Sequence, residues 1–242
     1  DKFGRSQPVV RVEDTRFLTG KGRYVADIAP ESALTGFVFR APVAHGVITG
    51  LDVSEARAAP GVHLVLSVED LEAAGMDISM QNTVVKNRDG TDGASPLRPI
   101  LAKERMRFVG EPVAFVVAET LDQARDAAEL IELEYDDLDA HMEVGPGDAV
   151  IHPEAPQNLA FDWGMGDEAA TEAAFQAAAH TVSLDVGDNR IICNAMEPRG
   201  CFAEWDGARL HVSLGAQGVW AHKAQLAKAL KLGPGAVHVT IP

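Results

Sequence analysis

The sequence has few cysteines, few basic residues and no long hydrophobic run. Cys193 and Cys201 are the only cysteines in 242 residues, so the chain cannot form a disulfide framework or a four-cysteine iron–sulfur site. Only 21 Lys and Arg oppose 36 Asp and Glu, a net charge of −15, which disfavours nucleic-acid binding. No run approaches the roughly 20 apolar residues of a membrane span. These absences predict a cytoplasmic protein with two reduced thiols.

The common catalytic and ligand-binding motifs are also absent. Gly20-Lys21-Gly22 lacks the third glycine of a dinucleotide-binding loop, and there is no P-loop. The eight histidines are scattered without metal-binding spacing, so we predict no metal site. Cys193 and Cys201 flank a proline-bearing turn near apolar residues, which predicts buried, inert thiols. A hydrolase that uses one of these thiols with a histidine remains an alternative.

The organisation of the chain follows from its loops and its charge. The apolar fraction of 46% is typical of a globular protein with a core. The segment from Gly145 to Asn158 is rich in proline and glycine, so we place a boundary there, between domains 1–145 and 146–242. Residues 111–143 carry 11 acidic side chains and one basic one, which indicates a solvated face; an acidic patch for a basic partner subunit is the alternative.

Hydrophobic patterns predict alternating strands and helices in the first domain. Residues 112–118 are continuously apolar, as in a strand buried on both faces. Thr120 and Gln123 form a capping box for the helix that follows, with Leu121, Ala124, Ala128 and Ile131 on one face. The other expected elements are strands at 35–40, 63–66 and 131–138, and a short helix that begins after Ser67 and ends at Gly75.

The second domain repeats this style. We expect helices over 167–179 and 218–232, the latter ended by Gly233 and Pro234, and strands over 182–186, 210–214 and 237–241. The last of these strands stops at Pro242, and the first residues show no signal-peptide pattern. We therefore expect a chain that has been cut at both ends. The fold class is α/β (α+β), in two layered domains.

Three groups of residues carry a family resemblance, in the same order along the chain. They are Leu18–Ile28 with Phe39–Gly46; Phe108–Ala114 with Ala127–Leu130 and Glu134–Leu138; and Met196–Gly200 with Leu214–Gln217. Together they resemble the molybdopterin-binding large subunit of the xanthine dehydrogenase, aldehyde oxidase and carbon monoxide dehydrogenase family. The resemblance implies a hammerhead domain over 1–145, followed by the beginning of the molybdenum cofactor domain over 146–242.

The resemblance also implies an activity and partners. Such a subunit oxidises a small carbon substrate (an aldehyde, an N-heterocycle, a purine or carbon monoxide) at a molybdenum–pterin centre, here expected in its cytosine dinucleotide form. Electrons pass to [2Fe-2S] clusters in a small subunit and to FAD in a medium subunit, and the full complex is expected to be a dimer of heterotrimers. A non-catalytic module for subunit interaction or scaffolding is the alternative.

Gln217 is the one cofactor-binding residue that the resemblance implies. It matches a family glutamine that donates a hydrogen bond to an oxo ligand of molybdenum without adding charge. Without the resemblance, Gln217 is interpreted as a helix-capping amide just before Val219. Glu197 does not match the family's catalytic glutamate and is expected to fix the backbone between domains through a charged pair, and Glu111 to be structural.

The resemblance further implies that part of the site is missing from this chain. In the family, a Gly-Gly-Gly-Phe-Gly loop follows the strand at 237–241, and the catalytic glutamate comes much later. We therefore assign no catalytic residue, and we expect the 242-residue chain alone to bind no cofactor tightly and to be inactive.

Overall fold

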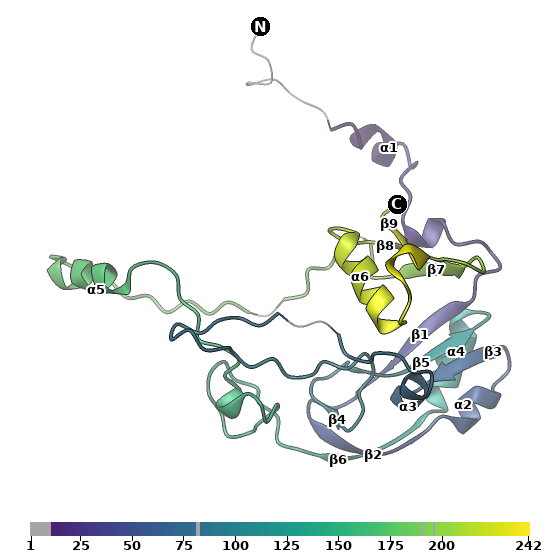
Figure 1. Ribbon diagram of the computed structural model, residues 1–242, viewed down its shortest axis with the longest axis horizontal. Helices are drawn as coiled ribbons and strands as arrows, with labels where there is room; N and C mark the ends of the chain where they lie inside the picture. The colour runs from purple at the N-terminus through teal and green to yellow at the C-terminus, as the bar shows by residue number, and fades with distance from the viewer. Residues whose placement is uncertain (1–10, 81–82, 190, 196) are drawn as a thin grey trace, which may run out of the picture. The chain divides into compact units, whose positions relative to one another are not determined.

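The computed structural model describes residues 11–80, 83–189, 191–195 and 197–242 (Figure 1). Its contacts divide the chain into two compact units. The larger unit is Leu34–Cys193, and the smaller unit combines Asp1–Ala33 with Asn194–Pro242. Met196, which forms part of one resembling segment, lies outside the described residues.

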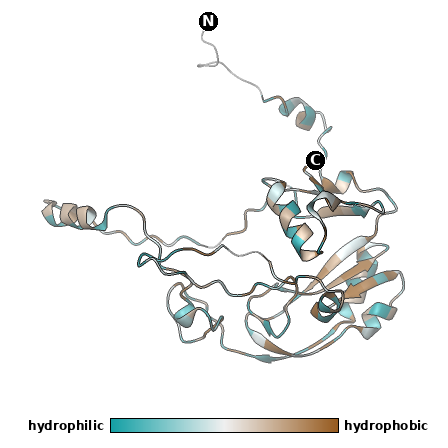
Figure 2. Ribbon diagram, viewed as in Figure 1, coloured by the Kyte–Doolittle hydropathy of each residue, from teal (hydrophilic) through white to brown (hydrophobic). Residues whose placement is uncertain are grey.

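The first sheet of the larger unit is built around its most apolar strand. Strand β5 (Pro112–Ala118) lies between β1 (Thr35–Arg40) and β3 (Val62–Leu66), and both pairings are antiparallel. Val113 and Val116 of β5 have no exposed surface, and the strands of this sheet are largely brown, or hydrophobic, in Figure 2. The predicted strands at 35–40, 63–66 and 112–118 are confirmed.

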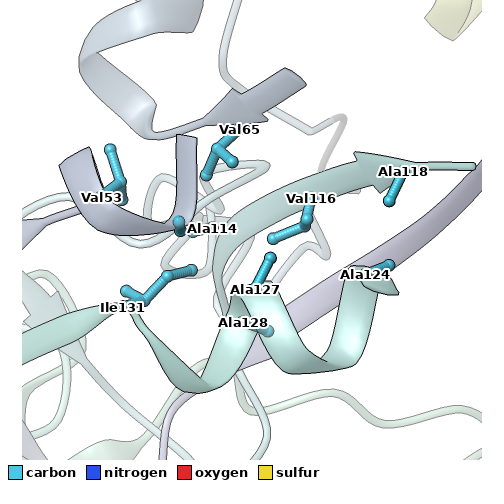
Figure 3. Close-up of a cluster of buried hydrophobic side chains, with 10 residues drawn as sticks. Val53, Val65, Ala114, Val116, Ala118, Ala124, Ala127, Ala128 and Ile131 are labelled. Carbon is cyan, nitrogen blue, oxygen red and sulfur yellow. The ribbon is translucent and has the colours of Figure 1, made fainter. Parts of the chain in front are cut away.

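Helix α4 (Leu121–Glu129) covers this sheet with small residues. Its N-terminus is capped by the Thr120 hydroxyl, which accepts the Gln123 N–H at 3.2 Å. Ala124 and Ala127 are fully buried and lie next to β5, as Figure 3 shows. Of the four residues predicted to share one face, Ala124, Ala128 and Ile131 are buried, whereas Leu121, the first residue of the helix, is 40% exposed.

The second sheet of the larger unit has the order β4-β2-β6 and is antiparallel. Its strands are β2 (Gly46–Asp52), β4 (Arg105–Met106) and β6 (Glu132–Asp137), so the strand predicted over 131–138 is confirmed. The fully buried Met106 is the centre of its core. Two short helices, α2 (Ser54–Ala58) and α3 (Val68–Ala73), complete this region, and α3 begins after Ser67 as predicted.

The last part of the larger unit contains little regular structure. A 3-10 turn (Pro156–Asn158) is followed by helix α5 (Glu168–Ala177), which confirms the predicted helix. None of the α5 residues is buried. The strand predicted over 182–186 is wrong: this segment is irregular, and Val182, Leu184 and Val186 are 91%, 82% and 76% exposed. An alternating pattern forms a strand only where a neighbour accepts its backbone hydrogen bonds, and no described strand does so here.

The smaller unit is a three-stranded sheet with one covering helix. Strands β7 (Cys201–Trp205) and β8 (Leu210–Leu214) form an antiparallel hairpin, and β9 (Val237–Thr240) pairs in parallel with β8. Helix α6 (Trp220–Ala229) connects β8 to β9 and packs Ala227 against Val237 and Val239. The remaining elements are helix α1 (Asp14–Leu18) and two 3-10 turns, Val25–Asp27 and Pro234–Ala236.

These elements confirm the predicted mixed α/β architecture and most of the predicted helices and strands of both parts of the chain. Among the described residues, no helix has the length and apolar character needed to cross a membrane. The proposed domain boundary near residue 145 remains a prediction.

Candidate functional site

The loop between β8 and α6 carries Gln217. Its side chain is exposed and forms no hydrogen bond with any described residue, so it does not cap α6. Gly218 has a φ of +153°, a backbone conformation that residues with a side chain rarely adopt. The loop therefore presents a free amide beside a position that only glycine fills without strain.

Glu197 connects this loop to the N-terminal part of the smaller unit. Its Oε1 accepts the backbone N–H of Val25 at 3.0 Å. Its Oε2 lies over Gly215, where an added Cβ would come within 2.8 Å of that oxygen. As expected, Glu197 fixes backbone, here within the smaller unit. Its partner is a backbone amide, however, and among the described residues it forms no ion pair, so the expected charged pair is wrong.

Both cysteines are exposed, so the predicted burial of the thiols is wrong. Cys193 lies in an irregular segment, and Cys201 begins β7, which is paired on one side only. Neither sulfur has a histidine hydrogen-bond partner among the described residues, and no group of three His, Cys, Asp or Glu side chains converges there to hold a metal ion. The geometry therefore offers no support for a thiol hydrolase.

Glu111 is a buried carboxyl group with a structural setting. It is 6% exposed and directly precedes β5. Its Oε2 accepts the Arg107 N–H at 2.6 Å, and its backbone carbonyl accepts the Ala41 N–H at 2.8 Å. Burial raises the pKa of the Glu111 carboxyl, although the Arg107 N–H and charge oppose that shift. These contacts fix the entry to the central strand, as expected for Glu111.

A second polar cluster lies on the sheet of the smaller unit and was missed by the sequence analysis. Asp206, His211 and His238 are joined by side-chain hydrogen bonds of 2.8 and 3.4 Å. His211 and His238 are 27 residues apart in the chain and meet only through the parallel pairing of β8 with β9. The one sequence signal is that each occupies a polar position within an alternating strand.

Comparison with known proteins assigns both parts of the chain to one family. Residues 19–139 match the aldehyde oxidase and xanthine dehydrogenase a/b hammerhead domain, and residues 151–242 match the molybdopterin cofactor-binding domain. The chain is 35% identical to the nicotine 6-hydroxylase large subunit of Paenarthrobacter nicotinovorans over 93% of its own length and 27% of that subunit. It is also 35% identical to the carbon monoxide dehydrogenase large chain of Hydrogenophaga pseudoflava, over 80% of this chain and 25% of the relative.

Solved structures show the same fold. The match to quinoline 2-oxidoreductase from Pseudomonas putida 86 covers 97% of this chain and 30% of the quinoline 2-oxidoreductase chain, at a TM-score of 0.74 and 32% identity. The match to aldehyde oxidoreductase from Desulfovibrio gigas covers 96% of this chain and 26% of the aldehyde oxidoreductase chain, at a TM-score of 0.77 and 28% identity. The chain thus spans about a quarter of the curated relatives' length. It belongs to the aldehyde oxidase and xanthine dehydrogenase family of molybdopterin-binding large subunits.

Proposed function

We propose that this chain is part of the large subunit of a molybdenum-dependent oxidoreductase that oxidises a small carbon substrate. The observation that carries the proposal is the free amide of Gln217, in a loop of the segment that matches the molybdopterin cofactor-binding domain. The relatives named as a nicotine hydroxylase and a carbon monoxide dehydrogenase support the reaction class but differ in substrate. The substrate class of this protein is an aldehyde, an N-heterocycle, a purine or carbon monoxide.

The residues of the loop fit a ligand that is rich in hydrogen-bond acceptors. The Gln217 side chain supplies two N–H donors and has no described partner to compete for them. Gly218 leaves open space where a side chain would stand. When bound, the molybdenum–pterin group supplies the oxidation of the substrate. Gln217 would hold that group by hydrogen bonds and would carry no proton, because an amide does not titrate in the physiological range.

Glu197 is a positioning residue in this proposal. Its carboxylate lies beside Gly215, two residues before Gln217, where an added Cβ would come within 2.8 Å of Oε2, and it is itself held by the Val25 N–H. A hydrogen-bond donor contributes to catalysis only when its position is fixed in advance, since a small displacement weakens the bond. Glu197 therefore acts on the reaction through the loop and not by proton transfer.

The rest of the assembly follows the same proposal. We infer a cytosine dinucleotide form of the pterin, [2Fe-2S] clusters in a small subunit, FAD in a medium subunit, and a dimer of heterotrimers in the cytoplasm. We further propose a boundary between the hammerhead domain, 1–145, and the cofactor-binding domain, 146–242, which the matched segments 19–139 and 151–242 support. No catalytic residue is assigned within the 242 residues, and the chain alone is expected to show no turnover.

The test uses the full-length subunit in its native complex. Molybdenum and iron content are measured by elemental mass spectrometry, and kcat is measured against each of the four substrate classes. The wild-type complex is expected to contain near-stoichiometric molybdenum and to oxidise one class. Gln217→Ala is expected to lower kcat roughly 100- to 1,000-fold, as for loss of one positioned donor. Gln176→Ala, in the exposed helix α5, is the matched control and should change nothing.

Two results would contradict the proposal. A complex without molybdenum, from a host that makes the cofactor, would favour the non-catalytic scaffold. A Gln217→Ala variant with unchanged kcat and molybdenum content would remove Gln217 from the site while leaving the family assignment intact.

A further inference from the structure

The open face of the sheet in the smaller unit brings two histidines together. In the register of β8 with β9, His211 lies directly beside His238. The alternate residues Val212, Val237 and Val239 are buried, the latter two against α6, so both histidines lie on the opposite face of the sheet. The two Nδ1 atoms are 3.4 Å apart, and the rings are nearly perpendicular.

Asp206 fixes the orientation of His211. Its Oδ1 accepts the backbone N–H groups of Ala208 and Arg209 at 2.8 and 2.7 Å, which holds the carboxylate in the β7–β8 turn. Its Oδ2 lies 2.8 Å from Nε2 of His211. Because a carboxylate only accepts, Nε2 must carry the proton of this bond. In the neutral ring the lone pair is then on Nδ1, the nitrogen that faces His238.

We propose that His211 and His238 form a binding site for a divalent transition-metal ion such as Zn²⁺. Two imidazole nitrogens bound to zinc at 2.0–2.1 Å with a tetrahedral angle are about 3.3–3.4 Å apart. The two Nδ1 atoms already have this separation, at 3.4 Å. His238 would bind with its proton on Nε2, and the ion would replace the hydrogen bond between the two rings.

The surroundings of the pair suit a cation. Asp206 would act as the carboxylate partner that orients a metal-bound histidine and raises its basicity. Glu204 lies opposite His211 on β7 and on the same face of the sheet, which adds a second negative charge. No third His, Cys, Asp or Glu ligand converges with the pair in the part of the chain that the structure describes, so water would occupy the other positions. Such an open site predicts micromolar affinity, weaker than a closed structural zinc site.

The experiment is a calorimetric titration of Zn²⁺ into the full-length subunit in its native complex. We expect one saturable site with micromolar affinity that His238→Gln abolishes. Asp206→Asn is expected to weaken binding about 10- to 100-fold, as for loss of an orienting partner. His180→Gln, an exposed histidine of the larger unit, is the matched control and should leave the affinity unchanged.

A second measurement locates the ion independently of protein stability. Crystals of the complex soaked in Zn²⁺ should show an anomalous peak between His211 and His238. Either absence of saturable binding, or binding that His238→Gln leaves unchanged in a folded variant, would overturn the proposal. An anomalous peak elsewhere and none between the two rings would do the same.

Discussion

The carboxylate of Glu197 accepts the backbone N–H of Val25 at 3.0 Å, although 172 residues separate them in the chain. Val25 lies in the segment that matches the hammerhead domain, and Glu197 lies in the segment that matches the cofactor-binding domain. The same carboxylate lies over Gly215, in the loop that carries Gln217. The Glu197 side chain therefore bonds to the segment that matches the hammerhead domain and lies beside the proposed cofactor loop of its own segment.

This link predicts an energetic coupling between Glu197 and Gly215. A Cβ at Gly215 would come within 2.8 Å of Glu197 Oε2, so Gly215→Ala requires the end of the Glu197 side chain to shift, and we expect this shift to weaken the bond between its Oε1 and the Val25 N–H. We expect Gly215→Ala and Glu197→Ala each to lower the free energy of unfolding by about 1–2 kcal/mol, because the buried amide loses its acceptor. In the Glu197→Ala background, Gly215→Ala should cost nothing further.

A double-mutant cycle measured by urea unfolding checks this coupling. The expected interaction energy is about 1 kcal/mol, and Glu197→Gln, which keeps an acceptor oxygen, serves as the control with a smaller loss. Additive costs of the two alanine substitutions would show that the contact between Glu197 and Gly215 has no energetic weight.

The caps of two helices should contribute very differently to stability. Thr120 caps α4, whose alanines are buried in the core, and Asp167 caps α5, which buries nothing. Thr120→Ala is expected to lower the free energy of unfolding by about 1 kcal/mol. Asp167→Ala should leave global unfolding unchanged and only increase amide hydrogen exchange within α5. Equal effects of the two substitutions on the urea midpoint would contradict this.

The burial of Glu111 predicts a loss of folding stability that depends on pH. Burial raises the pKa of its carboxyl in the folded state above the unfolded value, so the folded chain binds its proton more tightly. Stability from this group is therefore greatest at low pH and falls as pH rises through the raised pKa. Glu111→Gln, which retains an acceptor for the Arg107 N–H, should gain stability relative to wild type between pH 4 and 7. The urea midpoints of the wild type and of Glu111→Gln, measured at pH 4 and at pH 7, test this prediction. A difference between the two midpoints that is the same at both pH values would refute it.

The turn at Asp206 predicts a shift of the opposite sign. The backbone N–H groups of Ala208 and Arg209, followed by the His211 ring, lower the pKa of the Asp206 carboxyl to about 2. Its contribution to stability is thus present above the unfolded value of 3.8 and is lost as pH falls towards 2. Carbon-detected NMR titration should give this low value in the wild type. His211→Gln should raise it only in part, since the two backbone donors remain, and a full return to the ordinary pKa would contradict this order of causes.

The sequence predicts correctly those helices and strands whose apolar residues are covered, or whose ends are capped, by other residues of the chain. Residues 112–118 form β5 because their continuous apolar run is covered on both faces, and Thr120 supplies a local cap for α4. The pattern at 182–186 fails for a related reason. Alternation there marks the two faces of a possible strand but contains no information about a pairing partner, and the structure supplies none among the described residues.

The candidate sites depended on contacts that are distant in sequence. Gln217 was predicted only from the resemblance, because a lone amide between a strand and a helix has no chemical signature. The pair of His211 with His238 requires the register of the smaller unit's sheet, and the approach of Glu197 to Gly215 requires a fold that brings a loop before β7 beside the loop after β8. Sequence patterns place these residues on elements but cannot determine which elements become neighbours.

The pairing of β2 with β6 has a consequence for synthesis on the ribosome. Residues 46–52 emerge long before residues 132–137, which form the longer of the two pairings that β2 makes. At about 5–20 residues per second, this strand waits several seconds with its hydrogen-bonding edge unpaired. Val25 waits longer still, until Glu197 has left the exit tunnel. The nascent chain should therefore present an unpaired strand edge to chaperones until residue 137 has emerged, and the segment around Val25 should stay accessible to protease until Glu197 has emerged.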